Sequence, residues 1–448
     1  MPTEMTYEES LHYLNQFINY ETQPRATYDH EHFDLTNFSA FLDALGAPHR
    51  ALPSILIAGS KGKGSTAAMI AAMLSQAGLR TGLYTSPHLV TIRERVQIDR
   101  QLISPDAFAA LMSELRAHLA FTTAKPEQTF RTFFELLTAL AFLYFARQQV
   151  DIMVVEVGLG GRLDSTNVLT PSIAVITPIG FEHTHILGQT LSAIANEKAG
   201  IIKPHGEVIM APQEPQVLEV VEKRCERQQA TLYDASRTFT WCQLETVRGE
   251  NRIHFHGFDL DLENLLIPLL GQHQAINAAV ALAVLGRLRQ QGWRLEAQHL
   301  RQGLAGVLWE GRLEVIDRQP LVVLDAAHTI ESARYLAKAL TSLFSYQRLH
   351  LILGFSGDKK IHDIVNILAP IACTTIASSF SNPRAFDPNQ LAIILRSSCS
   401  HVQTAPDPAS ALTLARAHAD PEDLICITGS LLLLGELKAR LAGQSLEF

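Results

Sequence analysis

Residues 54–76 constrain the fold of this chain more than any other segment, because an apolar strand there leads through a glycine-rich loop directly into a helix. The run SILIA at 54–58 is typical of a strand buried in the middle of a parallel sheet. In the loop GSKGKG, the glycines let the backbone turn tightly and bring its N–H groups close to an anion. The helix TAAMIAAMLSQAG turns its positive N-terminal end toward the same place. We therefore predict an α/β fold with an anion-binding loop at the end of a central strand.

Three side chains at the end of this loop indicate that the anion is a nucleotide phosphate. Lys63 places a positive charge against phosphate, and Ser65 and Thr66 offer hydroxyl groups to Mg²⁺. The spacing differs from the common G-x-x-x-x-G-K-[ST] loop, whose first glycine would fall on Ile57, so we interpret the loop as a compressed variant. The alternative is an ordinary glycine-rich turn, which would need neither the lysine nor the hydroxyl groups.

Length, charge and cysteine content exclude several classes of protein. With 448 residues, the chain is long enough for two or three domains. Its net charge of −8 does not favour binding to nucleic acid, and its apolar runs are too short to span a bilayer. The five cysteines are scattered and form no C-x-x-C pair, which is typical of reduced thiols. We expect a cytoplasmic protein that binds neither nucleic acid nor membranes.

Strand and helix patterns alternate along most of the chain, which predicts parallel sheets with helices on both faces. The first series of strands is expected near 54–58, 81–84, 151–156, 172–177 and 207–211. Residues 230–269 differ, because their short segments predict antiparallel strands or hairpins, added as an edge extension of the first domain and followed by two helices. A second series of strands begins near 306–312, with the apolar runs LEVI, PLVVLDAAH, LHLILGFSGD, CTTIASSF and DLICITGS. We place the domain boundary there and expect domains at 1–305 and 306–448.

Polar residues follow four of the expected strands in the first domain, at the ends where open parallel sheets bind ligands. Besides the loop with Lys63, three other strands end at or lead to Ser86, Glu156 and His183. Oxygen ligands with one nitrogen suit Mg²⁺ beside nucleotide phosphates better than structural zinc. For Glu156 the alternative is a cap or an ion pair with Arg162, and for His183 it is an ordinary surface histidine.

Lys198 and the second domain leave more than one interpretation open. Lys198 ends a helical pattern, where a lysine normally complements the helix dipole; carbamylation by CO₂ would instead turn it into a metal-ligating carboxylate. In the second domain Asp325 and His328 follow one strand, and the forked guanidinium of Arg312 is suited to reach back to phosphate. The alternative for each is a helix cap or a surface ion pair. Two sets of strand ends that face a shared cleft favour an enzyme that closes over ATP.

Eight motifs follow one another along the chain: GSKGKGST, TSPHL, VVEVGLGGRLDSTN, GFEHTHILG, EKAGIIKP, GQHQAINA, WEGRLE and LDAAHT. Together they resemble the folylpolyglutamate synthase and dihydrofolate synthase family of the Mur ligase superfamily, over about residues 33–436. The resemblance implies a P-loop-type parallel-sheet ATPase domain with a small antiparallel extension and an N-terminal substrate-binding segment. A smaller, Rossmann-like C-terminal α/β ligase domain would follow it.

The resemblance also implies roles for individual residues. The ATP-binding positions fall on Gly62, Lys63, Gly64, Ser65, Asn277, Arg312 and Asp325. The positions for two Mg²⁺ ions fall on Ser86 with Glu156 and on His183 with a carbamylated Lys198. The catalytic positions fall on Lys63, Lys198 and His328, and the pterin pocket falls on Asp34, Thr132, Leu163 and Asp164. The chain departs from the family's pattern at Lys61, which replaces a neutral amide, and at Glu182, which replaces an aspartate.

We therefore predict an ATP-dependent amide ligase of folate and one-carbon metabolism, of the dihydrofolate synthase and folylpolyglutamate synthase type. The carboxylate of dihydropteroate or of a reduced folate attacks the γ-phosphate of ATP, and L-glutamate then attacks the acyl phosphate. The expected cofactors are two Mg²⁺ ions and the carbamylated lysine, and the expected state is a monomer. One rival interpretation is a Mur-type ligase for a non-folate carboxylate, such as a peptidoglycan-type precursor. The other is a nucleotide-dependent regulatory switch, which would hydrolyse ATP without glutamate.

Overall fold

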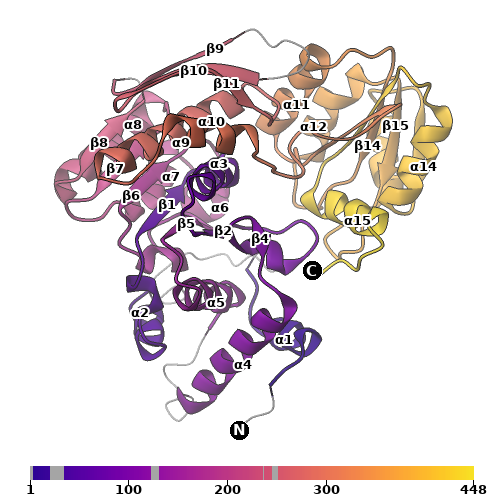
Figure 1. Ribbon diagram of the computed structural model, residues 1–448. Coiled ribbons are helices and arrows are strands. Elements are labelled where there is room, and N and C mark those ends of the chain that lie inside the picture. Colours follow the sequence, from indigo (N-terminus) through magenta and orange to yellow (C-terminus); the bar gives the residue numbers. More distant parts are fainter. Residues whose placement is uncertain (1–3, 21–34, 123–130, 236, 245–250, 448) are drawn as a thin grey trace.

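The computed structural model describes residues 4–20, 35–122, 131–235, 237–244 and 251–447. Within these ranges the strands form three sheets, of eight, three and six strands (Figure 1). The eight- and three-stranded sheets belong to the first unit, which is the part of the chain before β12 (Glu314–Arg318), and the six-stranded sheet belongs to the second unit. No helix in the described part of the chain is long and apolar enough to cross a bilayer.

The eight-stranded sheet has the order β4-β3-β2-β5-β1-β6-β7-β8. Its strands are β1 (Ser54–Ala58), β2 (Thr81–Tyr84), β3 (Val96–Ile98), β4 (Gln101–Leu102), β5 (Ile152–Glu156), β6 (Ile173–Ile176), β7 (Glu207–Met210) and β8 (Thr231–Asp234). All neighbours from β2 to β8 are parallel, and β3 and β4 add an antiparallel edge. The five strands expected from the sequence are therefore confirmed, with β1 at the centre. The β3–β4 edge and β8 were not predicted as members of this sheet.

Helices cover both faces of this sheet because its central strands are buried on both sides. In β1, Leu56 packs into a cluster with α5, whereas Ile55 and Ile57 pack into a cluster with α3 and α9. The helices on the α5 face are α1 (Tyr7–Leu14), α2 (Leu35–Ala44), α4 (Pro105–Thr122), α5 (Phe133–Arg147), α7 (Leu191–Lys198) and α8 (Pro215–Gln228). Those on the other face are α3 (Lys63–Gln76), α9 (His273–Gln290) and α10 (Ala297–Ala305), and the short α6 (Thr184–Leu187) follows β6.

The predicted antiparallel extension is a sheet of its own, with the order β11-β10-β9. It consists of β9 (Thr240–Gln243), β10 (Asn251–Gly257) and β11 (Leu260–Ile267). Its apolar residues Ile253, Phe255 and Leu262 share one cluster with α3 and α9. The extension therefore packs over the helices of one face (Figure 1) instead of lengthening an edge of the large sheet.

The second unit is a smaller α/β domain around a mixed sheet of order β12-β13-β17-β14-β15-β16. Its strands are β12 (Glu314–Arg318), β13 (Leu321–Asp325), β14 (Leu349–Leu353), β15 (Thr374–Ser378), β16 (Val402–Ala405) and β17 (Leu424–Thr428), of which only β12 is antiparallel. Helices α11 (Ile330–Leu343), α12 (Ile361–Leu368) and α13 (Pro388–Leu395) cover one face, and α14 (Pro408–His418) and α15 (Leu431–Leu441) cover the other. The edge strand β16, VQTA, was not predicted because half of its residues are polar.

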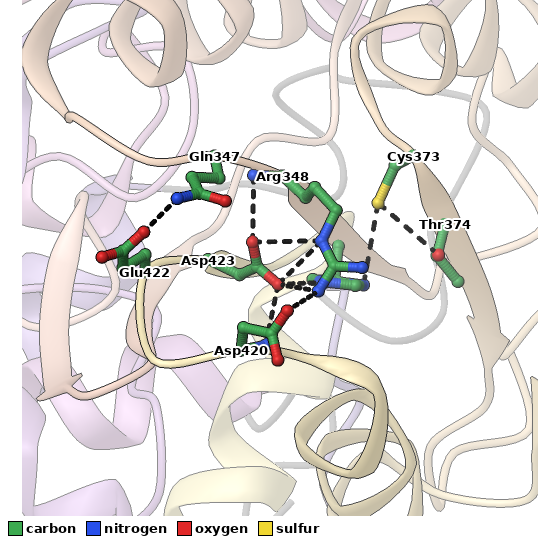
Figure 2. A network of polar contacts seen from close by, with 8 residues as sticks. Gln347, Arg348, Cys373, Thr374, Asp420, Glu422 and Asp423 are labelled. Atoms are coloured by element: carbon green, nitrogen blue, oxygen red, sulfur yellow. Dashed lines mark hydrogen bonds and ion pairs between the residues drawn. The ribbon is translucent and has the colours of Figure 1, made fainter.

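A polar network fixes the beginnings of strands β14, β15 and β17 in the second sheet (Figure 2). Arg348 donates to the carboxylates of Asp420 and Asp423, each at 2.6 Å. Burial alone would raise the pKa of Asp423, but the hydrogen bonds from Arg348 and from the Asp420 backbone N–H help to lower it to about 2. This end of the sheet is held by its own side chains, so the opposite, carboxyl ends of the strands are the ones where a parallel sheet would bind a ligand.

Candidate active site

The glycine-rich loop between β1 and α3 is tied to the segment that follows β6. The backbone N–H groups of Ser60 and Lys61 both donate to the carbonyl of Pro178, at 3.0 and 3.1 Å. Lys63, the first residue of α3, donates from Nζ to the carbonyl of Gly59 at 3.2 Å. The Lys63 ammonium therefore lies over the loop at the positive end of α3, where a phosphate group would be bound.

Two glycines in this loop are required by close contacts from distant parts of the chain. Gly62 has φ +81°, and a Cβ there would lie 2.2 Å from Oδ1 of Asn277 on α9. A Cβ on Gly64 would lie 2.6 Å from Cζ2 of Trp309, which stands between α10 and β12. Asn277 and Trp309 thus face the loop, and any side chain at these two glycines would displace them.

Glu156, at the end of β5, lies beside the loop. Its Oε2 atom accepts a hydrogen bond from the backbone N–H of Ser86 at 3.2 Å. Burial raises the pKa of Glu156, and the positive charge of Lys63 opposes that shift. The alternative partner Arg162 pairs instead with Glu197, at 2.9 Å. The structure thus brings Ser86, Glu156 and Lys63 to one edge of the sheet.

Lys198 is the last residue of α7, yet its side chain is turned inward and is buried. Its Nζ atom donates to Glu182 at 2.5 Å and to the Gly59 carbonyl at 2.8 Å. Burial lowers the pKa of Lys198 to about 8, although the Glu182 carboxylate opposes the shift. His183, with φ +44°, lines the same small cavity of about 20 Å³ together with Lys63. The predicted pair Lys198 and His183 therefore meets beside the phosphate loop.

Asp325 ends β13 in the second unit, and its carboxylate is held by the backbone. Its two oxygens accept from the N–H groups of Leu313 and Ala327, both at 3.0 Å. Burial raises the pKa of Asp325, and the guanidinium of Arg312 opposes this shift. The same guanidinium also acts on Glu156 of the first unit, so Arg312 lies between the two units.

His328 is held as a neutral imidazole with a defined orientation. Its Nδ1 atom lies 2.8 Å from the carbonyl oxygen of Ala326. Because a carbonyl can only accept, we infer that Nδ1 carries the hydrogen and that Nε2 is an acceptor. Burial lowers the pKa of His328 to about 4, so the ring is uncharged at neutral pH.

A cleft of about 2260 Å³ between the two units connects these groups. Its lining includes the predicted residues Gly62, Lys63, Gly64, Ser65, Ser86, Glu156, His183, Asn277, Arg312, Asp325 and His328. Lys198 lies behind them in the adjoining small cavity. Lys61 spans the cleft, since its Nζ atom donates to Oγ1 of Thr329 at 3.4 Å.

Three of the four predicted pterin-pocket residues line the same cleft. They are Thr132, Leu163 and Asp164, whereas Asp34 lies outside the described residues. The Thr132 hydroxyl caps α5. The Asp164 carboxylate accepts from the backbone of Leu159 at 2.8 Å and of Thr166 at 3.0 Å, so it also orders the loop after β5.

Sequence reasoning missed the aromatic residues Trp309, His273 and Tyr335 in the cleft. The rings of His273 and Tyr335 lie 6.2 Å apart across the two units, and Tyr335 is 61% exposed. An exposed tyrosine on a helix resembles any surface residue in sequence. Trp309 and His273 did have a signal, because they lie in the motifs WEGRLE and GQHQAINA.

The residues around Glu156 fit a hard cation that binds together with a nucleotide. Glu156 is a buried carboxylate whose pKa is raised, so a nearby cation would offset the cost of its charge. In the described ranges, no three His, Cys, Asp or Glu side chains form a complete metal site. One carboxylate and the Ser86 hydroxyl leave the remaining positions to phosphate oxygens and water, which is usual for Mg²⁺.

Comparison with protein families matches two parts of the chain. Residues 57–285 match the Mur ligase middle domain, and residues 311–431 match the Mur ligase, glutamate ligase domain. The chain is 34% identical to the dihydrofolate synthase/folylpolyglutamate synthase of Bacillus subtilis over 402 residues, which cover 89% of this chain and 92% of the relative. It is 33% identical to the folylpolyglutamate synthase of Lacticaseibacillus casei over 441 residues, or 98% and 99% of the two chains.

Solved structures agree with the sequence comparison. Mycobacterium tuberculosis folylpolyglutamate synthase complexed with ADP superimposes with a TM-score of 0.87 and 34% identity, covering 98% of this chain and 100% of the other. Escherichia coli FolC in complex with DHPP and ADP gives a TM-score of 0.85 at 27% identity, covering 99% of each chain.

Proposed function

The chain belongs to the dihydrofolate synthase/folylpolyglutamate synthase family of Mur ligases, and on that premise we propose how its residues perform the reaction. The protein is an ATP-dependent ligase that joins L-glutamate, through a new amide bond, to a carboxylate of a folate or of dihydropteroate. The following roles of individual residues are our proposal.

The observation that supports this assignment best is the meeting of the two units at the phosphate loop. Lys63 comes from the first unit, Arg312 and Asp325 come from the second, and all three line one cleft. We assign Gly62, Gly64 and Ser65 to the phosphates through the loop backbone and the Ser65 hydroxyl. We assign Asn277 to the nucleotide from the same side as the loop, next to Gly62, and Arg312 and Asp325 to the nucleotide from the second unit, across the cleft.

The reaction begins when a carboxylate oxygen of the acceptor attacks the γ-phosphorus. A C–O–P bond forms, the bond between the γ-phosphorus and its bridging oxygen breaks, and ADP leaves. We assign Lys63 and Arg312 to stabilise the negative charge of the transferred group. The amino nitrogen of glutamate then attacks the acyl carbon, phosphate leaves, and the nitrogen loses its proton. We assign Nε2 of His328 as a hydrogen-bond acceptor for the incoming amino group.

Ser86 and Glu156 would hold one Mg²⁺ ion, and His183 with Lys198 would hold the second. When bound, Mg²⁺ neutralises charge on the phosphate oxygens. For the second site, Lys198 must first become a carbamate: its neutral amine forms an N–C bond to CO₂ and loses a proton. The support for this step is the buried position of Lys198 and its pKa of about 8, which leaves more of the amine neutral than in water.

Thr132, Leu163 and Asp164 are proposed to line the pterin pocket, on the first-unit side of the cleft. Closure of the two units over the acyl phosphate would exclude water, which would otherwise hydrolyse it. We further propose that the protein acts as a monomer in the cytoplasm, where its five free cysteines would stay reduced.

The decisive experiment measures ADP release from ATP with L-glutamate and one acceptor, using dihydropteroate and tetrahydrofolate in separate reactions. Repeated turnover to ADP should require ATP, glutamate and a suitable acceptor together, whereas without glutamate at most one ADP is formed per protein molecule, with the acyl phosphate. Repeated turnover without glutamate, or any release of ADP without an acceptor, would contradict the proposed order of steps. Mass spectrometry of the product then shows whether one glutamate or a chain is added.

A further inference from the structure

The loop that contains Ser86 is packed into the second unit, although it belongs to the first. Leu89 and Val90 in this loop are buried, and they share a hydrophobic cluster with Leu434 and other residues of α15. Gly435 of α15 allows the close approach, since a Cβ there would lie 2.0 Å from the backbone oxygen of Leu89. The position of this loop therefore depends on contacts from the second unit.

Glu447, which follows α15, contacts the same loop with its side chain and its backbone. Its Oε2 atom accepts three hydrogen bonds: from Tyr7 Oη at 2.8 Å, from Thr91 Oγ1 at 2.6 Å and from the Ile92 N–H at 3.1 Å. Its own N–H donates to the carbonyl of Val90 at 3.0 Å. Figure 1 shows this end of the chain beside the part of the first unit labelled β4. One residue of the second unit thus joins the loop to helix α1.

His88 extends this contact toward the active site. Arg95 Nε donates to His88 Nδ1 at 2.8 Å, so Nδ1 has no hydrogen and Nε2 carries one. The Nε2–H group then donates to the carbonyl oxygen of Glu447, at 2.7 Å. The Arg95 guanidinium lies 5.7 Å from the ring centre of Phe133, at the start of α5, and its charge acts on Glu156. Contacts therefore connect Glu447 with the surroundings of Glu156.

We propose that Glu447 is a positioning residue that anchors the loop 86–92 and thereby sets the place of Ser86 beside Glu156. The loop has internal support as well, because the Glu94 carboxylate accepts from the N–H groups of three successive residues, Leu89, Val90 and Thr91, at 2.7–2.8 Å. Loss of the Glu447 carboxylate would therefore loosen the loop without unfolding it, while Leu89 and Val90 keep their contacts with α15. The consequence for the cation site rests on the proposed role of Ser86 as a ligand.

Two substitutions test the anchor independently in the full chain. Glu447→Ala removes the acceptor for three hydrogen bonds, and Gly435→Ala forces the Leu89 carbonyl away from α15. Glu447→Gln keeps an oxygen at the same distance from the backbone and should largely restore the contact. Gln444→Ala is the matched control, since Gln444 lies in the same segment and is exposed.

Hydrogen exchange of the peptide covering residues 85–95 is the first measurement. We expect roughly tenfold faster exchange in Glu447→Ala and in Gly435→Ala, with near-normal exchange in Glu447→Gln and Gln444→Ala. Binding of Mn²⁺ to the protein–ADP complex, followed by electron paramagnetic resonance, is the second. A loss of affinity of about tenfold in Glu447→Ala is expected from a misplaced ligand loop.

Unchanged exchange in both Glu447→Ala and Gly435→Ala would overturn the anchor. Faster exchange with unchanged Mn²⁺ affinity would overturn its link to the cation site, provided that Ser86→Ala weakens Mn²⁺ binding. If Ser86→Ala binds Mn²⁺ like the wild type, Ser86 is not a ligand. The proposed function then fails at that residue, and the exchange measurement still decides on the anchor.

Discussion

The ammonium of Lys198 lies 2.5 Å from the carboxylate of Glu182, in the wall of a cavity that also contains Lys63. Burial alone would raise the pKa of Glu182, but the positive charges of Lys198 and Lys63 hold it below its usual range. Burial lowers the pKa of Lys198. Glu182 is therefore ionised and favours the charged form of Lys198, but burial outweighs it, so more of the amine is neutral than in water, and the neutral amine is the form that reacts with CO₂.

Replacing Lys198 with alanine should reduce ADP formation by a factor of about 10² to 10³, because the second Mg²⁺ ion that we propose beside the γ-phosphate would lose its ligand. Formate or acetate added at millimolar concentration should restore part of the activity by filling the space with a carboxylate. Lys203→Ala is the control, since Lys203 belongs to the same motif but donates to the Asn167 carbonyl at 2.6 Å. Equal rescue of both variants would argue against a carbamate at Lys198.

The lowered pKa of Lys198 also predicts how recovery from CO₂ depletion varies with pH. At a pH above the Lys198 pKa of about 8 the amine is mostly neutral. At a lower pH the protonated form, which does not react with CO₂, increases. Protein freed of CO₂ should therefore recover activity more completely with the same dissolved CO₂ at pH 8 than at pH 6. ADP release after addition of bicarbonate measures this, and recovery independent of pH would contradict the assignment.

Gly62→Ala should weaken ADP binding much more than Gly78→Ala, although both glycines have φ near +80°. The backbone strain is shared and costs about 1 kcal/mol in each variant. A Cβ at Gly62 must also displace Asn277, whereas nothing lies within 4 Å of one at Gly78. Calorimetry of ADP binding should show a loss of affinity only in Gly62→Ala, and equal affinities would remove Asn277 from the nucleotide site.

Glu156→Gln should leave the metal-free protein at least as stable as the wild type. The reason is the sign of the shift: burial raises the pKa of Glu156, so the folded state disfavours its charge, and an uncharged isostere removes that cost. Adding Mg²⁺ and ADP should raise the melting temperature of the wild type but have little effect on the variant. A full ligand-induced rise in Glu156→Gln would show that this carboxylate does not hold the cation.

Substitutions of Lys63 and Lys61, the two lysines of the glycine-rich loop, should reduce ADP formation to different extents. Lys63→Ala should abolish ADP formation, with a loss of about 10³ or more, because its ammonium lies over the phosphate site. Lys61→Asn should leave most of the turnover at saturating substrate, since Lys61 Nζ contacts Thr329 across the cleft. Steady-state kinetics of ADP formation measure both variants, and thermal unfolding checks that each is folded. Equal losses of turnover in Lys63→Ala and Lys61→Asn would contradict the different roles of the two lysines.

Much of the fold could be predicted because the burial of a parallel strand leaves a clear signal. The runs at β1, β5 and β17 are apolar at nearly every position, since helices cover both faces of each sheet. The edge strands β4 and β16 have exposed or partly exposed positions and no such signal. Ser86, Glu156 and Asp325 could be predicted as members of one site because parallel strands deliver their last residues to the same edge. Asn277, on a helix, and the pterin-pocket residues were predicted only from the resemblance to the family.

The linear sequence by itself determined which groups are available: the glycines and Lys63 of the loop, the carboxylates at strand ends, and the order of motifs that marks the family. These depend on local spacing and on the strand direction, which the chain encodes over short distances. The tertiary structure alone decided which partners these groups have. Lys198 faces Glu182, Trp309 covers Gly64, and Glu447 contacts Thr91 across 356 residues of chain. Such contacts follow from the packing of whole units against one another, for which no local pattern exists.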